Sequence, residues 1–376
     1  MWKMRILTEC VRTRVRAARV TAALLVAAAL LAAAVGPAAA QGICPERYHV
    51  EVDGQRLSLP YCTTAPIDQR NENVERIVFS LHGVGTNATS YFRSMVRAAE
   101  RVPGATERTL IIAPKLMTRA FAADNDIGPT DVYWNTSSQR FWGGQSGNSA
   151  ELPRAVSVSS FEIMDRLLTD LTNPEIFPNL KIIVLAGHSG GGQFMNRYAV
   201  SNVFEGDPAR QRGVHIRYVV AQPSTHVYLS DERVEPGHRT RSRFRVPTAE
   251  EIAACPGFDN YGTGLQRLDN WPYLAAAGVD RMRQQYAGRD VVYLHGMNDS
   301  DPTASDLARG CAAMMQGQHR LERGITYFNY IEHYFAGQHN HRISFVPRVG
   351  HNAGAMWASD QGLLHIFDHA VTLIRR

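Results

Sequence analysis

The residues best suited to chemistry lie in one short stretch, Lys181 to Tyr198, which reads KIIVLAGHSGGGQFMNRY. An apolar run ends at Gly187, a serine stands among small residues just after it, and helical spacing follows. A serine on a sharp turn between a strand and a helix presents its hydroxyl above the sheet edge, where it can act as a nucleophile. Glycines around it remove side chains that would collide with the adjoining strand and helix. The stretch therefore predicts Ser189 as a nucleophile.

A serine hydroxyl needs a positioned base, and the base needs a carboxylate that orients it. His351 follows a predicted strand and is flanked by Gly350 and Asn352, so we expect it to be the base. Two aspartates follow an earlier predicted strand, and of these we expect Asp299 to be the acid. Asp301 is the alternative, although its place ahead of a proline suits the cap of a following helix.

Three other histidines are less suitable as the base. His341 is predicted at a strand edge and His369 in a terminal helix. His188 adjoins the serine, but on such a turn we expect it to point elsewhere and to be structural. His339 and His341 are only two residues apart, which is weak support for a metal site. No metal and no cofactor are predicted.

Backbone N–H groups that stabilise a developing oxyanion are predicted at two places. The helix that begins after Ser189 offers the N–H of Gly190. The loop after an early strand, SLHGVG, offers the N–H of Val84, because His82-Gly83 lets the backbone approach closely. We expect Val84 and Gly190 to form an oxyanion hole.

The elements that must position these residues alternate between strand-like apolar runs and helical periodicity. This alternation is typical of an α/β fold with a mostly parallel sheet and helices on both faces. Ligands gather at the carboxyl ends of such strands. Strands are predicted at 76–83, 109–117, 181–187, 214–223, 291–296 and 343–349, and helices at 90–102, 161–172, 192–203, 305–317, 325–335 and 362–376.

Two regions depart from this alternation. Residues 41–75 contain two alternating runs around Asp53-Gly54, which predicts an N-terminal hairpin segment ahead of a domain spanning 76–376. Residues 224–289, rich in Arg, Pro and Gly, break the alternation and predict a lid-like insertion.

Four cysteines remain once Cys10 is removed with the predicted leader described below, and three pairings are possible. The hairpin brings Cys44 and Cys62 opposite or nearly opposite each other, which leaves Cys255 and Cys311 as partners. We expect both disulfides, with free structural thiols as the alternative, because an oxidising compartment preserves such bonds.

The first forty residues are predicted to be a signal peptide. Six basic residues precede an apolar stretch from Val20 to Val35, and Ala38 to Ala40 offers the small residues of a cleavage site. Removing residues 1–40 leaves 34 basic and 34 acidic residues, so neither a nucleic-acid partner nor stable membrane association is expected. A secreted or periplasmic protein is predicted; an uncleaved membrane anchor is the minority alternative.

The motifs HGVG, GHSGG, GMNDSD and VGHNAGAMW occur in this order between residues 76 and 376. In this respect the chain resembles serine esterases of the α/β-hydrolase superfamily, and is similar to exported carboxylesterases and polyester-depolymerase-like members. The resemblance implies an α/β-hydrolase fold, a Ser189–His351–Asp299 triad, and oxyanion donors at Val84 and Gly190. It implies hydrolysis of a small-molecule or polymeric ester, but the chain lacks the separate binding modules of many polymer-degrading relatives.

Two further clusters could contact a substrate. Tyr133, Trp134 and Trp142 lie in a loop beside the presumed site, where exposed aromatics could form an acyl- or aryl-binding wall; packing of the loop explains them equally well. Arginines alternate from Arg239 to Arg245, and we interpret them as a solvated face rather than an anion grip.

The function expected from the sequence is hydrolysis of a carboxylic ester through an acyl-enzyme. A serine peptidase of the same fold is the enzymatic alternative, because amide and ester hydrolysis use the same machinery. An exported binding protein that kept the serine turn without activity is the non-enzymatic alternative.

Overall fold

The computed structural model describes residues 44–134, 141–144, 152–206, 213–238 and 240–370. The predicted signal peptide, residues 1–40, lies outside the described residues. Within those residues, no helix combines the length and the apolar character needed to cross a membrane.

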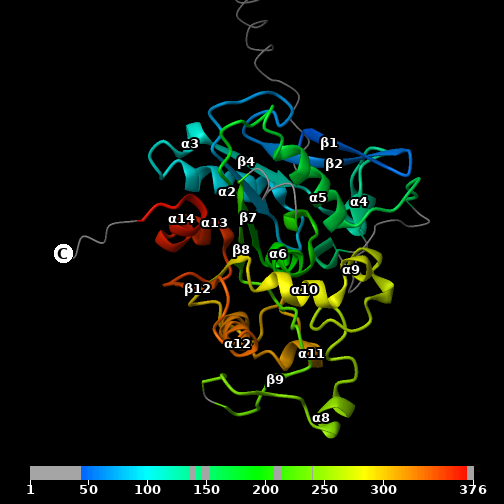
Figure 1. The fold of residues 1–376 in the computed structure, drawn as a ribbon, viewed down its shortest axis with the longest axis vertical. Helices are drawn as coiled ribbons and strands as arrows, with labels where there is room; N and C mark the ends of the chain where they lie inside the picture. Colours follow the sequence, from blue (N-terminus) through cyan, green and yellow to red (C-terminus); the bar gives the residue numbers. More distant parts are fainter. Residues whose placement is uncertain (1–43, 135–140, 145–151, 207–212, 239, 371–376) are drawn as a thin grey trace, which may run out of the picture. The chain divides into compact units, whose positions relative to one another are not determined.

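An eight-stranded sheet forms the centre of the fold, in the order β1-β2-β4-β3-β7-β8-β11-β12 (Figure 1). Strands β3 to β12 of this sheet pair in parallel, whereas β1 and β2 add to its edge in antiparallel fashion. The mostly parallel sheet is the one that the sequence predicts. Its strands are β1 Glu46–Val52, β2 Gln55–Thr63, β3 Arg76–Leu81, β4 Thr109–Pro114, β7 Ile182–His188, β8 His215–Ala221, β11 Asp290–Gly296 and β12 His341–Val346.

Both faces of the sheet are buried, which explains why its strands read as continuous apolar runs. Side chains alternate between the faces, so Ile77 and Phe79 join one core cluster while Val78 joins the other. The first face is covered by α5 Ser160–Leu171, α6 Gly190–Ser201, α10 Val279–Tyr286 and α12 Arg320–Tyr334, and the second by α2 Ala88–Ala99, α13 Ala353–Trp357 and α14 Asp360–Phe367.

The predicted N-terminal hairpin is present. Asp53 and Gly54 both have positive φ, 48° and 73°, and join β1 to β2 with Val52 opposite Gln55. Two such residues are what a two-residue turn between twisted strands requires. The disulfide Cys44–Cys62 closes the hairpin at its other end, as predicted.

Residues 224–289 lie between β8 and β11, where the insertion is predicted. The segment contains β9 Arg233–Val234, β10 Phe244–Arg245, α8 Ala249–Ala254, α9 Pro272–Ala277 and α10. Its last helix belongs to the body of the fold, because Met282 is fully buried and the Tyr286 hydroxyl accepts a hydrogen bond from Asn196 of α6. The predicted disulfide Cys255–Cys311 joins the end of α8 to α11, Cys311–Met314.

Two predicted helices are shorter than the sequence suggests. In 305–317 only the four residues of α11 are helical, and the preceding residues form turns that end at Gly310. The closing helix α14 ends at Phe367, because Asp368 takes a left-handed conformation with φ 56°. Ion pairs from Asp368 to Arg76 and Arg217 hold this end against β3 and β8.

The remaining described elements are short. They are α3 Ala105–Arg108, β5 Met117–Thr118, α4 Arg119–Asp124, β6 Tyr133–Trp134 and the 3-10 turns Phe141–Gly143, Phe204–Gly206 and Leu268–Asn270.

Candidate active site

Ser189 occupies a strained turn between β7 and α6. Its backbone has φ 59° and ψ −118°, a combination that side-chain-bearing residues rarely adopt. Two of the glycines around it, Gly187 and Gly191, have no room for a side chain. A Cβ at Gly187 would overlap the carbonyl of Gly191, and one at Gly191 would overlap the carbonyl of Leu81. The glycine-rich stretch is therefore a steric requirement of this turn, as the sequence predicts.

The structure brings His351 to Asp299 rather than to Asp301. The Nδ1 atom of His351 lies 2.8 Å from Oδ2 of Asp299, whose side chain is 5% exposed. Asp301 instead accepts hydrogen bonds from the backbone N–H and the hydroxyl of Thr303. The two loops are also joined through their backbones, because the N–H of Asn298 donates to the carbonyl of Val349.

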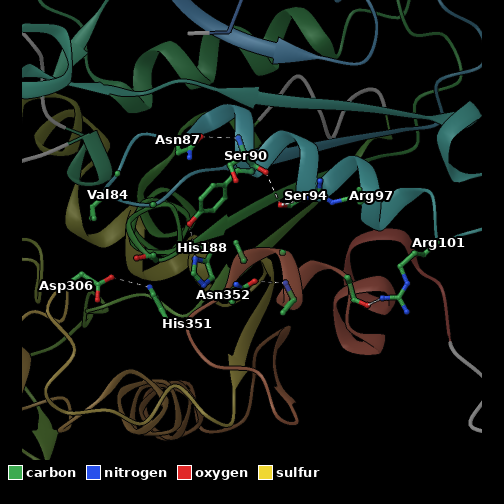
Figure 2. A pocket seen from close by; sticks show the side chains of 18 of the residues that line it. Val84, Asn87, Ser90, Ser94, Arg97, Arg101, His188, Asp306, His351 and Asn352 are labelled. Atoms are coloured by element: carbon green, nitrogen blue, oxygen red, sulfur yellow. Dashed lines mark hydrogen bonds and ion pairs between the residues drawn. The ribbon is translucent and has the colours of Figure 1, made fainter. Parts of the chain in front are cut away.

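His351 and Ser189 line the same cavity. The other ring nitrogen of His351 is Nε2. Nε2 is buried and makes no hydrogen bond within the described part of the chain, so the structure forms no hydrogen bond between Ser189 and His351. Its charged neighbour is Asp306, with Oδ2 at 3.5 Å (Figure 2). Hydrogen bonds between a nucleophile and its base are often long or poorly aligned without substrate and tighten when substrate binds.

A buried arginine links the two carboxylates that face His351. Arg320 is 1% exposed; its Nη2 lies 2.8 Å from Asp306 and its Nη1 lies 3.6 Å from Asp299. Partial burial opposes ionisation of Asp306, but the close guanidinium of Arg320 and the charge of His351 outweigh it and hold the pKa of Asp306 below its usual value. We call His351, Asp299, Asp306 and Arg320 the charge cluster.

His188 has a larger part in the site than the sequence suggests. The prediction that it points elsewhere is wrong, since its ring centroid lies 4.5 Å from that of His351. Its Nε2 lies 2.7 Å from Oε1 of Gln222, and its Nδ1 lies 3.1 Å from the hydroxyl of Tyr91. Burial, followed by the charge of His351, lowers the pKa of His188 to about 3, so the ring stays neutral.

Gln222 also connects His188 to the loop that carries His351. Its side-chain N–H donates to the carbonyl of Gly350 at 2.9 Å, next to His351. Because an amide oxygen only accepts, the Nε2–H of His188 donates to Gln222, and Nδ1 accepts from Tyr91. No local motif marks Tyr91, Gln222, Asp306 or Arg320, since their roles depend on contacts between distant segments.

The two predicted oxyanion donors lie side by side. A Cβ placed on Gly190 would stand 3.1 Å from the backbone nitrogen of Val84, and one on Gly83 would stand 3.3 Å from Cβ of Ser189. The loop is fixed by buried His82, whose Nδ1 lies 2.8 Å from the carbonyl of Gly83 and whose Nε2 accepts from the N–H of Leu116. Burial lowers the pKa of His82 to about 4.

A cavity of about 880 Å³ opens over Ser189, and we call it the Ser189 cavity. One wall is α2 and the loop before it, and the other is His351 with α13 (Figure 2). The wall from α2 is polar, with hydroxyls, an amide and charged groups. Its side chains are Asn87, Ser90, Tyr91, Ser94, Arg97, Glu100 and Arg101.

The predicted aromatic wall is not part of this cavity. Tyr133 and Trp134 are fully buried in core clusters, and the indole N–H of Trp134 donates to the carbonyl of Val158. Trp142 is half-buried and packs edge-on against Phe141. The prediction of exposed substrate-binding aromatics is therefore wrong, because the loop packs onto the body of the fold.

Two other predictions can be compared with the structure. None of the described residues between 224 and 289 lines the Ser189 cavity, so the insertion does not cover it there. Of the alternating arginines, Arg239 lies outside the described residues, whereas Arg241 and Arg245 form ion pairs with Glu322 and Glu251. Groups of three or more potential metal ligands do not occur among the residues that the structure describes.

Comparison with known proteins supports the fold. No family model matches the chain, and no curated protein matches it significantly. Among solved structures, LpqC, a poly(3-hydroxybutyrate) depolymerase from Bordetella parapertussis, is 20% identical with a TM-score of 0.56, covering 87% of this chain and 92% of its own. Poly(aspartic acid) hydrolase-1 from Sphingomonas sp. KT-1 is 21% identical with a TM-score of 0.49, covering 84% and 96% respectively. The chain thus has the predicted α/β-hydrolase fold, and at these identities the similarity concerns the fold alone.

Proposed function

We propose that this protein is a serine hydrolase that cleaves carboxylic esters through an acyl-enzyme. Ser189 is the nucleophile, His351 is the base and Asp299 orients the imidazole. The backbone N–H groups of Val84 and Gly190 stabilise the oxyanion. These roles follow the chemistry that a serine needs to attack a carbonyl.

One observation carries the proposal. A serine held at φ 59° by surrounding glycines lines the same cavity as a histidine whose Nδ1 lies 2.8 Å from a buried carboxylate. Strained backbone of this kind persists only where the surrounding structure holds it, and it is concentrated at functional sites. Among the described residues, Nε2 of His351 makes no hydrogen bond that proton uptake would break.

The reaction follows from these positions. His351 takes the proton of Ser189 as the serine oxygen bonds to the ester carbonyl carbon, and then gives that proton to the leaving alcohol as the acyl–oxygen bond breaks. Water then attacks the acyl-serine with His351 again as base, and the carboxylic acid and free serine are released. Asp299 stabilises the imidazolium in both steps without taking the proton.

Labelling with a fluorophosphonate, followed by peptide mapping, tests the nucleophile. We expect modification at Ser189 alone, and Ser189→Ala to abolish both labelling and hydrolysis of p-nitrophenyl butyrate. Labelling at another residue, or an unchanged rate in Ser189→Ala, would contradict the proposal. A folded protein that neither labels nor turns over any ester would favour the exported binding protein instead, and turnover restricted to a peptide panel would favour a peptidase.

Export of the protein belongs to the same proposal. The predicted leader is supported by two disulfides, Cys44–Cys62 and Cys255–Cys311, which persist in oxidising compartments. Sequencing the N-terminus of the exported protein tests this, and we expect it to begin at Gln41. Retention of residues 1–40 in the mature protein would contradict cleavage.

A further inference from the structure

The end of the Ser189 cavity that lies along α2 is lined by two arginines. Arg97 folds back along its helix, where its Nη2 donates to the hydroxyl of Ser94 at 3.3 Å. Arg101 reaches across to the carbonyl of Ala358, beyond α13 on the opposite wall (Figure 2). Within the described residues neither guanidinium forms an ion pair, although Glu100 also lines the cavity. Arg97 therefore keeps most of its donors available for a ligand.

The charge at the His351 side of the cavity has the opposite sign. Asp306 lines the cavity there, with Oδ2 3.5 Å from Nε2 of His351, and its ionised form is held by Arg320. Figure 2 shows the two ends on opposite sides of His188, with Asp306 beside His351 and Arg97 on α2. A substrate that spans the cavity meets a carboxylate near the reacting histidine and a guanidinium away from it.

We infer that the Ser189 cavity accepts an ester whose acyl part carries a carboxylate, which Arg97 binds. This inference rests on the proposed function and names the substrate class of that same site. Arginine suits a carboxylate because its planar, always charged guanidinium matches the two carboxylate oxygens.

The side of the ester that carries the anion follows from proton transfer. His351 gives its proton from Nε2 to the leaving alcohol, so the alcohol lies beside Nε2 and therefore beside Asp306. A negative charge on the alcohol would be repelled there, which leaves the acyl part to extend along α2.

The other properties of this wall agree with such a substrate. Ser90, Ser94 and Asn87 line the same wall of the cavity as Arg97. Their hydroxyls and amide make this wall better suited to oxygen-bearing acyl chains than to plain alkyl chains. A volume of about 880 Å³ leaves room for an extended acyl group.

Two matched six-carbon substrates test the inference, p-nitrophenyl hexanoate and the mono-p-nitrophenyl ester of adipic acid. We expect the wild-type protein to have a higher kcat/KM for the anionic ester. Arg97→Gln should lower kcat/KM for the anionic ester about fivefold, which is the size of effect expected from an exposed ion pair. The same substitution should leave kcat/KM for the neutral ester unchanged. The matched control is Arg93→Gln, on the same helix but outside the cavity lining, which should change neither.

Two further readouts separate this inference from the proposed function. The preference should shrink in 1 M NaCl, because salt screens an exposed pair. Binding of adipate, measured by calorimetry, should weaken in Arg97→Gln but not in Arg93→Gln even if no ester is turned over. Ser189-dependent hydrolysis without any preference for the anionic ester, or equal effects of Arg97→Gln on both esters, would overturn the inference while leaving the proposed function intact.

Discussion

The two sides of the Ser189 cavity are held in place by different forces. On the side of Ser189, backbone segments of β3, β7 and α6 approach so closely that glycine alone fits at Gly187 and Gly191. On the side of His351, ion pairs hold the four side chains of the charge cluster together. Asp299 and Asp306 come from the connection after β11, His351 from the loop after β12, and Arg320 from the start of α12. The first side depends on shape and the second on charge, so different perturbations should affect them.

The largest effect is expected on the charged side, from Asp299→Asn. The amide cannot stabilise the imidazolium and favours the wrong tautomer of His351, so kcat/KM for p-nitrophenyl butyrate should fall about 10³-fold or more. Asp301→Asn is the matched control, because Asp301 contacts Thr303 and not the imidazole. An equal loss in both variants would contradict the assignment of Asp299.

The next effect concerns shape. In Gly191→Ala the added methyl overlaps the carbonyls of Leu81 and His82, so the free energy of unfolding should fall by about 2–3 kcal/mol, measured by urea denaturation. In Gly85→Ala the methyl would meet no atom within 4 Å, and the change should stay within about 0.5 kcal/mol. Similar stabilities of the two variants would show that the turn around Ser189 can relax.

The same contrast explains how much could be predicted from the sequence. The turn at Ser189 is a local steric problem, so glycines adjacent in the chain reveal it, and strand ends reveal Asp299 and His351. Asp306 lies in the connection after β11 and Arg320 at the start of α12, and their pairing depends on the three-dimensional arrangement of these elements. The sequence leaves the roles of Tyr133 and Trp134 open for the same reason, because composition does not distinguish an exposed aromatic wall from a packed loop.

A smaller effect concerns two fully buried histidines, His226 and His295, whose ring centroids lie 6.2 Å apart. The four ring nitrogens of His226 and His295 make no hydrogen bonds among the described residues. Burial lowers the pKa of His295 to about 4 and that of His226 well below its usual value. The unfolded chain binds protons below about pH 6.5 while the folded one does not, so stability is full above that pH and falls toward pH 4.

The slope of this fall is measurable by denaturation at a series of pH values. Each such histidine contributes up to about 1.4 kcal/mol per pH unit. His295→Gln should flatten the slope between pH 6.5 and 4, whatever its effect at neutral pH. His238→Gln, which changes a half-buried histidine whose Nδ1 lies 3.1 Å from the hydroxyl of Thr240, is the control measured under the same conditions. An unchanged slope in His295→Gln would mean that His295 binds protons equally in both states.

The smallest effect is expected from Asp306→Asn, and it separates charge from shape within the active site. Oδ2 of Asp306 lies 3.5 Å from Nε2 of His351 and stabilises the imidazolium that forms when His351 takes the serine proton, so its removal should lower kcat/KM for p-nitrophenyl butyrate. Asp306 is 38% exposed, and solvent screening limits the loss to about threefold. The loss should diminish in 1 M NaCl, whereas Asp301→Asn should cause none. A loss that persists in high salt would indicate that the substituted amide has altered the geometry around His351 rather than its electrostatic environment.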